Sequence, residues 1–353
     1  MTILDLYLIR AFFRHFFLLV FVLALLFGFF DFLAQLEEVG HGNYTLLKAL
    51  TYVFLTSGGR IYDLLPMISL LASLLSLGTL GDRNELLAMQ AAGMDRHRMG
   101  LAMMAGLLVL LVIFLLGEET VFPRAEHRAW LLKARALSTR GVTPYGQGFW
   151  ARDRDTFIHV EKVLGKGVLA GIEIFSFDDE GRLRRFLTAQ MGKVGDDHWL
   201  LIGVSEQEFL PHGVREKRHA RLRIRAFLKT GEVKNLAVPP EFLSLSELWR
   251  SKRSLEEGGQ NAYRYGLLFW QKVFVLPTAI FMLFLALSFV LRPYQERGRG
   301  FRVGAGAIFG LFVYLGEQVL AHLGLVLEWP PLVVAAAPCL FIFLLAFWRW
   351  RAL

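Results

Sequence analysis

His159 and Glu161 are the nearest approach in this sequence to a general acid–base pair. They stand two residues apart in FIHVEK, residues 157–162, so the alternation of a strand would place both on one face. No G-x-x-x-x-G-K-[ST], H-E-x-x-H or G-x-S-x-G motif accompanies them, and no His is followed by Asp five positions later. We therefore expect a chain without catalysis of its own. A membrane enzyme that modifies an envelope lipid stays open as an alternative.

A second group of candidate residues lies in GDRNELLAMQAAGMDRHRMG, residues 81–100, between two apolar runs. Asp82 and Glu85 have the spacing of an N-cap and its N3 partner, and Gly93 stands where a glycine would end a helix. The spacing predicts a helix over about 82–93. Because so short a helix needs packing to persist, it lies either on lipid headgroups as an elbow or in a cytosolic partner that presents a basic residue to Glu85.

The composition indicates what these residues are attached to. The chain has 353 residues, of which 55% are hydrophobic, and its mean hydropathy is +0.44. The apolar residues gather in runs of about 20, the length that crosses roughly 30 Å of hydrocarbon. The runs predict an integral membrane protein with six transmembrane helices in a 3+3 arrangement, over residues 16–36, 61–80, 101–122, 267–291, 303–323 and 332–348.

The distribution of arginine predicts the orientation of these spans. Basic residues flank the spans on one side, at Arg10, Arg14, Arg83, Arg96, Arg98, Arg292, Arg297, Arg299, Arg302, Arg349 and Arg351. The segment after the first span carries Glu37 and Glu38 instead. The positive-inside rule therefore predicts that both termini lie in the cytoplasm. The net charge of +8 has the same explanation, so it indicates no nucleic acid partner.

Residues 140–262 form the one large piece between spans, and their local pattern is typical of β-structure. GIEIFSF, the turn DDEG and RLRRFLTA make a hairpin signature. We expect an inserted, periplasmic all-β domain of the sandwich or jelly-roll type. Ser244 and Glu247 have capping-box spacing for a helix that returns to the membrane. The predicted domains are thus 1–139, 140–262 and 263–353.

Several of these segments, in order along nearly the whole chain, resemble the LptF/LptG family of lipopolysaccharide export permeases. They are GDRNELLAMQAAG, QGFWARD, FIHVEK, GGQNAYRYGLLFWQKVFVLP and ALSF. The QGFWARD segment and the GQ-x-A-x-RY block are more similar to the LptG branch than to the LptF branch. The resemblance implies a permease subunit that lifts lipopolysaccharide from the Gram-negative inner membrane. A non-transporting envelope scaffold is the remaining alternative.

The resemblance also implies partners. These are an LptF-like second permease, an LptB-like dimeric ATPase, an LptC-like single-span protein and an LptA-like periplasmic bridge. ATP and Mg²⁺ would bind in the ATPase, and this chain would hold no cofactor or metal. The helix over 82–93 corresponds to the coupling helix, with Glu85 as the acidic contact to the ATPase. Leu86, Met89 and Met94 would be its apolar footing, with Arg83 beside them.

Lipopolysaccharide is a polyanion on a bundle of acyl chains, so the implied site needs cations above an apolar volume. The candidate cations are Arg60, Arg124, Arg128, Lys133 and Arg135, and each cation near an anionic surface contributes about 1 kcal/mol. Lys133 aligns with a basic headgroup contact of the family. Asp31, Glu37 and Glu38 replace lysines of better-known members, so acid stands where cations are expected; pairing of Asp31 with a neighbouring cation would explain it.

Three apolar residues and one acid complete the candidate substrate site. Phe30, Leu64 and Leu65 could line the acyl cavity or simply pack. Glu317 falls within the fifth span, where a carboxylate at mid-bilayer costs about 2.5–3.5 kcal/mol. It should therefore face protein, water or a partner.

Overall fold

The computed structural model describes residues 2–351 except 138–145, 154, 165–166, 179, 196, 211–212, 227–237, 258 and 291–298. Arg292 and Arg297, which supported the orientation, and the predicted start of the β-domain at residue 140 lie outside the described residues. The chain divides into two compact units. The membrane unit comprises Met1–Leu33, Thr56–Phe122 and Gly266–Leu353, and the second unit comprises Ala34–Leu55 and Pro123–Tyr265.

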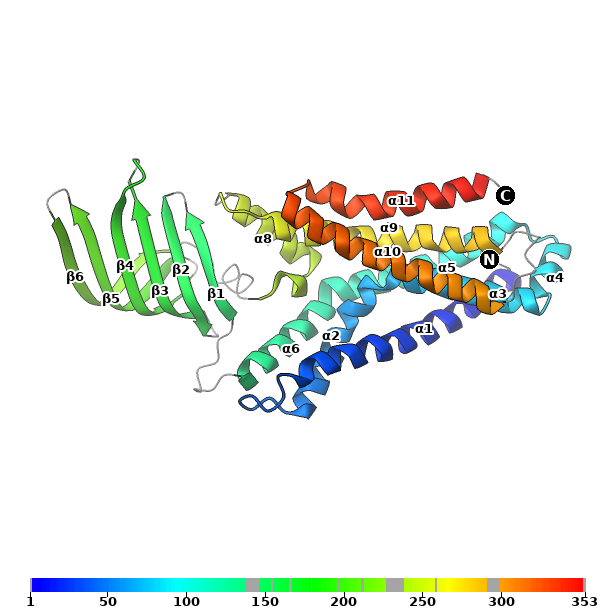
Figure 1. Cartoon of the computed structure of the whole chain (residues 1–353), viewed down its shortest axis with the longest axis horizontal. Helices are drawn as coiled ribbons and strands as arrows, with labels where there is room; N and C mark the ends of the chain where they lie inside the picture. The colour runs from blue at the N-terminus through cyan, green and yellow to red at the C-terminus, as the bar shows by residue number, and fades with distance from the viewer. Residues whose placement is uncertain are drawn as a thin grey trace. The chain divides into compact units, whose positions relative to one another are not determined.

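Among the described residues, six helices are long and apolar enough to cross a membrane, which confirms the predicted six-span class. They are α1 (Ile3–Leu36), α3 (Leu65–Asp82), α5 (Arg96–Thr120), α9 (Tyr263–Val290), α10 (Arg299–Leu327) and α11 (Pro331–Arg351). Helix α1 begins well before residue 16, because its first turns bury Leu8 and Phe12 in the protein core rather than in lipid. Helix α1 begins and α11 ends at the end of the membrane unit that carries the short helix α4 (Glu85–Ala91) (Figure 1).

The second span differs from the prediction because the helix breaks. Helix α2 (Leu46–Asp63) ends before Leu64, and α3 starts afresh with Pro66 in its first turn. Proline has no N–H and fixes its own φ, so it is accommodated in a first turn but not in a helix interior. The apolar run over 61–80 hid this boundary.

A second interruption separates α5 from α6 (Phe122–Leu137). The Phe122 ring lies against two helical glycines, one on each neighbouring helix. A Cβ at Gly58 would come 2.5 Å from Phe122 Cδ1, and one at Gly117 would come 2.7 Å from Phe122 Cζ. The absence of side chains at these two positions is what lets the ring enter between α2 and α5.

The second unit carries the predicted β-domain. Its described strands form one antiparallel sheet in chain order (Figure 1): β1 (Gly146–Asp153), β2 (Thr156–Leu164), β3 (Val168–Phe177), β4 (Leu183–Lys193), β5 (His198–Leu210) and β6 (Gly213–Arg225). Each strand pairs with the next along the chain, and at the end of β3 and β4 the Asp178 N–H donates to Arg182 O at 2.9 Å. The two sheets of a jelly roll are therefore not what these strands form.

Alternation sets the core of the sheet. Val160, Ile172, Ala189 and Val204 occupy one cross-strand row over β2–β5 and are nearly inaccessible. The chain leaves the domain through the 3₁₀ turn η1 (Pro240–Phe242) and helix α8 (Leu245–Glu257). The predicted capping box is confirmed: Glu247 N donates to Ser244 Oγ at 3.3 Å, and Ser244 N donates to Glu247 Oε2 at 3.0 Å.

Candidate functional site

The short helix between the second and third spans is α4 (Glu85–Ala91). Its N-cap is Asn84, with φ of 57°, two residues after the predicted Asp82, because α3 runs on to Asp82. The prediction for its other end is confirmed. Gly93, with φ of 86°, donates its N–H to Gln90 O, and Met94 N–H donates to Met89 O, both at 3.0 Å. These two bonds make a Schellman motif.

The residues predicted as the apolar footing of α4 pack against this chain itself. Leu86, Met89 and Met94 are only 8%, 6% and 3% exposed, and they belong to the same buried cluster as Leu8 and Phe12 of α1. Their surface is already used by the membrane unit, because a helix of seven residues must bury one face to persist. These three side chains hold α4 onto its own chain.

The opposite face of α4 is the one available to another protein. Leu87 is 66% exposed, and Ala88, Ala91 and Ala92 beside it are exposed as well. Small residues around one leucine allow a close approach of a partner's surface. The sequence could not separate the two faces, because apolar residues occupy both.

Glu85 lies at the first position of α4 and is held from two sides. Tyr7 Oη of α1 donates a hydrogen bond to Glu85 Oε2 at 2.7 Å, and Arg83 Nη1 is 3.9 Å from Glu85 Oε1. The Glu85 side chain keeps 29% of its surface exposed, and Arg83 keeps 72%. Glu85 can therefore still accept a hydrogen bond from outside while bonded to α1.

In the membrane unit, Asp31 of α1 pairs with Arg60 of α2 at 2.7 Å, which confirms the pairing weighed for Asp31. Phe30 is 58% exposed, and Glu317 of α10 is half-buried. Leu64 and Leu65 are 1% and 0% exposed. These two leucines fill the core at the α2–α3 break, which is the packing alternative considered for them.

In the second unit, the first turns of α2 run beside α6. Lys133 of α6 is 2.9 Å from Glu38 Oε2, and its ammonium lies over the Tyr52 ring, 5.2 Å from the centroid. The loop before α2 closes onto α6 through Asn43 N, which donates to Ala136 O at 2.7 Å. Burial, together with the nearby Glu38 carboxylate, raises the pKa of Tyr44 to about 12.

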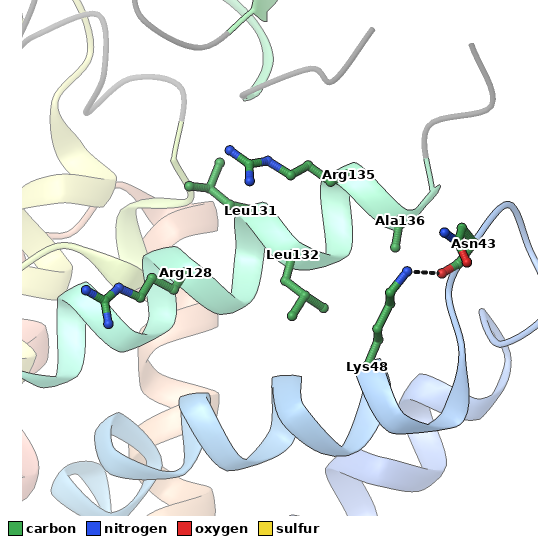
Figure 2. A pocket seen from close by; sticks show the side chains of 7 residues that line it. All are labelled: Asn43, Lys48, Arg128, Leu131, Leu132, Arg135 and Ala136. Atoms are coloured by element: carbon green, nitrogen blue, oxygen red, sulfur yellow. Dashed lines mark hydrogen bonds between the residues drawn. The ribbon is translucent and has the colours of Figure 1, made fainter. Parts of the chain in front are cut away.

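A pocket of about 480 Å³ opens between the same two helices, and Lys133 is not among its lining residues. Lys48, Arg128 and Arg135 supply three cations, and Asn43, Leu131, Leu132 and Ala136 complete the lining. Figure 2 shows Lys48 reaching from α2 toward Asn43, whose carbonyl accepts its hydrogen bond at 2.5 Å. A lining that contains three cations and two leucines is suitable for a phosphate on an acyl-chain lipid. Arg124 is exposed one turn before Arg128.

The sequence analysis predicted Arg128 and Arg135 as site residues but missed Lys48 and Asn43, which line the same pocket. The signal that could have found Lys48 is its spacing four residues before Tyr52, because helical residues four apart share a face. Tyr7 was also missed: its hydroxyl meets Glu85 across a sequence separation of 78 residues. No local pattern reports so distant a contact.

The candidate acid–base pair of the β-domain is divided between different partners. His159 Nδ1 is 3.1 Å from Glu173 Oε2, and its ring stacks on Trp150 at 4.5 Å. Glu161 instead accepts from Lys162 at 2.7 Å, which lowers the pKa of the Glu161 carboxyl. A carboxyl with a lowered pKa is a weaker base at neutral pH. His159 and Glu161 are each hydrogen-bonded to a different neighbour on the strand surface, so they do not form an acid–base pair.

Comparison with known proteins gives a full-length match. The family model "Lipopolysaccharide export system permease LptF/LptG" matches residues 6–352. The chain is 32% identical over 349 residues to the lipopolysaccharide export system permease protein LptG of Escherichia coli (strain K12), covering 98% of this chain and 97% of that protein. It is 29% identical over 319 residues to the LptG of Haemophilus influenzae, covering 90% and 89%.

Proposed function

This chain belongs to the LptF/LptG family of lipopolysaccharide export permeases, and from that premise we propose that it is the LptG-like permease subunit of an ATP-driven lipopolysaccharide exporter. The observation that carries the proposal is the match over residues 6–352, which takes in all six spans, α4 and the sheet domain. The chain would sit in the inner membrane, with both termini and α4 in the cytoplasm and the sheet domain in the periplasm.

The chain would depend on partners for energy and for delivery. An LptB-like dimeric ATPase would bind ATP and Mg²⁺, while an LptF-like permease would complete the membrane assembly. An LptC-like protein and an LptA-like bridge would receive the glycolipid. The exposed face of α4 around Leu87 supports the first of these partnerships, because a 66% exposed leucine beside a partly exposed carboxylate suits a protein interface.

Cationic side chains of this chain would bind the glycolipid headgroup. In the second unit, the pocket of Lys48, Arg128 and Arg135 offers charge to a phosphate, and Arg124 extends it. Lys133 and Arg60 are balanced by Glu38 and Asp31, so a phosphate must compete with these carboxylates. Phe30, which is exposed on α1, remains a candidate acyl-chain contact, and Glu317 a candidate polar one.

Co-purification and reconstitution test this function. The assembled complex in proteoliposomes should release lipopolysaccharide to a soluble acceptor when ATP is added. Leu87→Glu places a charge on the exposed face of α4 and should remove the ATPase from the complex. Leu210→Glu is the matched control, because Leu210 is a similarly exposed leucine, at 44%, at the end of β5. The proposal fails if Leu87→Glu leaves the assembly unchanged or if Leu210→Glu disrupts it equally, and also if the purified chain alone moves or chemically alters the glycolipid.

A further inference from the structure

We propose that Tyr7 is a positioning residue that passes the movement of α4 directly to the first transmembrane helix. The inference deepens the proposed function and rests on it, because it needs an ATPase that moves α4. The contact that carries it is the hydrogen bond from Tyr7 Oη to Glu85 Oε2, at 2.7 Å across 78 residues of sequence. Glu85 is the first residue of α4, so this bond joins the start of α4 to the second turn of α1.

A second tie joins α1 to α5, the helix that follows α4 in the chain. Arg98, in the first turn of α5, donates from Nε to Asp5 Oδ1 and from Nη2 to Asp5 Oδ2, both at 3.3 Å. The same Nη2 donates to Thr2 Oγ1 at 3.0 Å, and Thr2 N donates to Asp5 Oδ2 at 2.7 Å. The first turn of α1 is therefore bonded to the helix that follows α4.

Apolar packing makes the connection stiff. Leu8 and Phe12, which follow Tyr7 by one and five residues, are 1% and 0% exposed and belong to the buried cluster that contains Met89 and Met94 of the α4 segment. Packed cores transmit displacement because they are dense and nearly incompressible. The two polar contacts then fix the position of α1 relative to the other helices: Tyr7 is bonded to α4, and Asp5 is bonded to α5.

The consequence for transport is that α1 receives movement without the long route through α3 or α5. The apolar part of α1 presents exposed large side chains such as Phe21, Leu25 and Phe29. Only 11% of the residues in its most apolar 18-residue stretch are buried. The exposed side of α1 is not held by other residues of this chain, so a pull at the end that carries Tyr7 would shift α1 within the membrane. Tyr7 would thus set how much glycolipid movement each hydrolysed ATP produces, without contacting either the nucleotide or the glycolipid.

Tyr7→Phe tests this role, because it removes one oxygen atom and leaves the ring. In the complete complex in proteoliposomes, the variant should keep the ATPase bound and hydrolysing, while the amount of lipopolysaccharide released per ATP falls by roughly threefold to tenfold, the range expected for one lost hydrogen bond. Arg98→Gln, which weakens the second tie, should lower the same ratio. Tyr265→Phe, which removes a hydroxyl from α9, should leave it unchanged.

Glu85→Gln separates transmission from docking. Glutamine keeps an oxygen that accepts the Tyr7 hydrogen bond but loses the charge offered to the ATPase, so this variant should weaken assembly more than Tyr7→Phe does. An unchanged release per ATP in Tyr7→Phe overturns the inference, and so does loss of the ATPase from that variant, which would make Tyr7 part of the docking surface. If the wild-type complex itself releases no glycolipid on ATP addition, it is the proposed function that fails.

Discussion

Glu118 of α5 and Lys272 of α9 form an ion pair inside the membrane unit, with 1% and 9% of their residue surfaces exposed. The pair joins the first three spans to the last three. Two buried hydrogen bonds act beside it, from Tyr62 Oη to Lys272 O at 2.9 Å and from Ser69 Oγ to Ala279 O at 2.8 Å. Helix α9 is thus tied by polar contacts to α2, α3 and α5, the elements that carry these partners. Charged groups in a membrane interior persist where they satisfy one another.

The first prediction follows from this pair. Lys272→Met removes the cation and leaves the Glu118 carboxylate buried without its charge partner, which should cost about 3–5 kcal/mol. The double variant Glu118→Gln, Lys272→Met should recover most of that loss, because it removes both charges. Melting of the detergent-solubilised protein measures both. A double variant as unstable as the single one would show that the charges are not what matters at this position.

The second prediction concerns Lys133, whose ammonium is balanced by Glu38 at 2.9 Å. Glu38→Gln removes the carboxylate that neutralises the Lys133 ammonium, so that the ammonium is available to an anionic lipid. The retention of lipopolysaccharide should rise by a few-fold, because a partly exposed ion pair contributes up to about 1 kcal/mol. Glu37→Gln removes the same charge from the exposed neighbouring residue. Equal gains in the two variants would trace the effect to net charge rather than to the ion pair.

The sequence was sufficient for features that local chemistry determines. Six apolar runs marked the spans, DDEG marked the β3–β4 turn, and Ser244 with Glu247 marked the start of α8. Gly93 marked the end of α4 because few other residues adopt its positive φ without strain. The break before α3 also had a signal, Pro66, but the continuous apolar run outweighed it in the interpretation.

What the sequence did not yield is which partner each polar side chain chooses. Glu118 and Lys272 are 154 residues apart, and Asp31 and Arg60 are 29 apart, so no periodicity relates them. Which face of α4 is buried could not be predicted from the sequence for another reason. Leu86 and Leu87 are adjacent and chemically identical, yet one is buried and the other is exposed, and only the packing of Leu86 into the core of the membrane unit distinguishes them.

The third prediction is a pH dependence at the β3–β4 turn. Asp178 accepts hydrogen bonds from the backbone N–H groups of Arg182 at 2.8 Å and Glu180 at 3.1 Å, and these bonds lower the pKa of its carboxyl below 3.8. A group whose pKa is lowered by folding stabilises the fold above its unfolded pKa, and this contribution disappears as the pH falls through the folded value. The wild-type melting temperature should therefore fall more steeply below about pH 4 than that of Asp178→Asn. Parallel melting curves for the two proteins would contradict this.

The last prediction tests the insertion of Phe122 between α2 and α5. Gly58→Ala would place a Cβ 2.5 Å from Phe122 Cδ1, well inside van der Waals contact, and overpacking of this kind costs about 1–3 kcal/mol. Adding Phe122→Leu to that variant should recover part of the stability, because the smaller side chain leaves room for the methyl group. Gly316→Ala in α10 is the matched control: a Cβ there meets nothing within 4 Å, and alanine favours a helix over glycine. Melting of the four detergent-solubilised proteins decides between steric conflict and a general intolerance of glycine replacement. If Gly58→Ala and Gly316→Ala melt alike, the ring does not need the space that the glycine leaves.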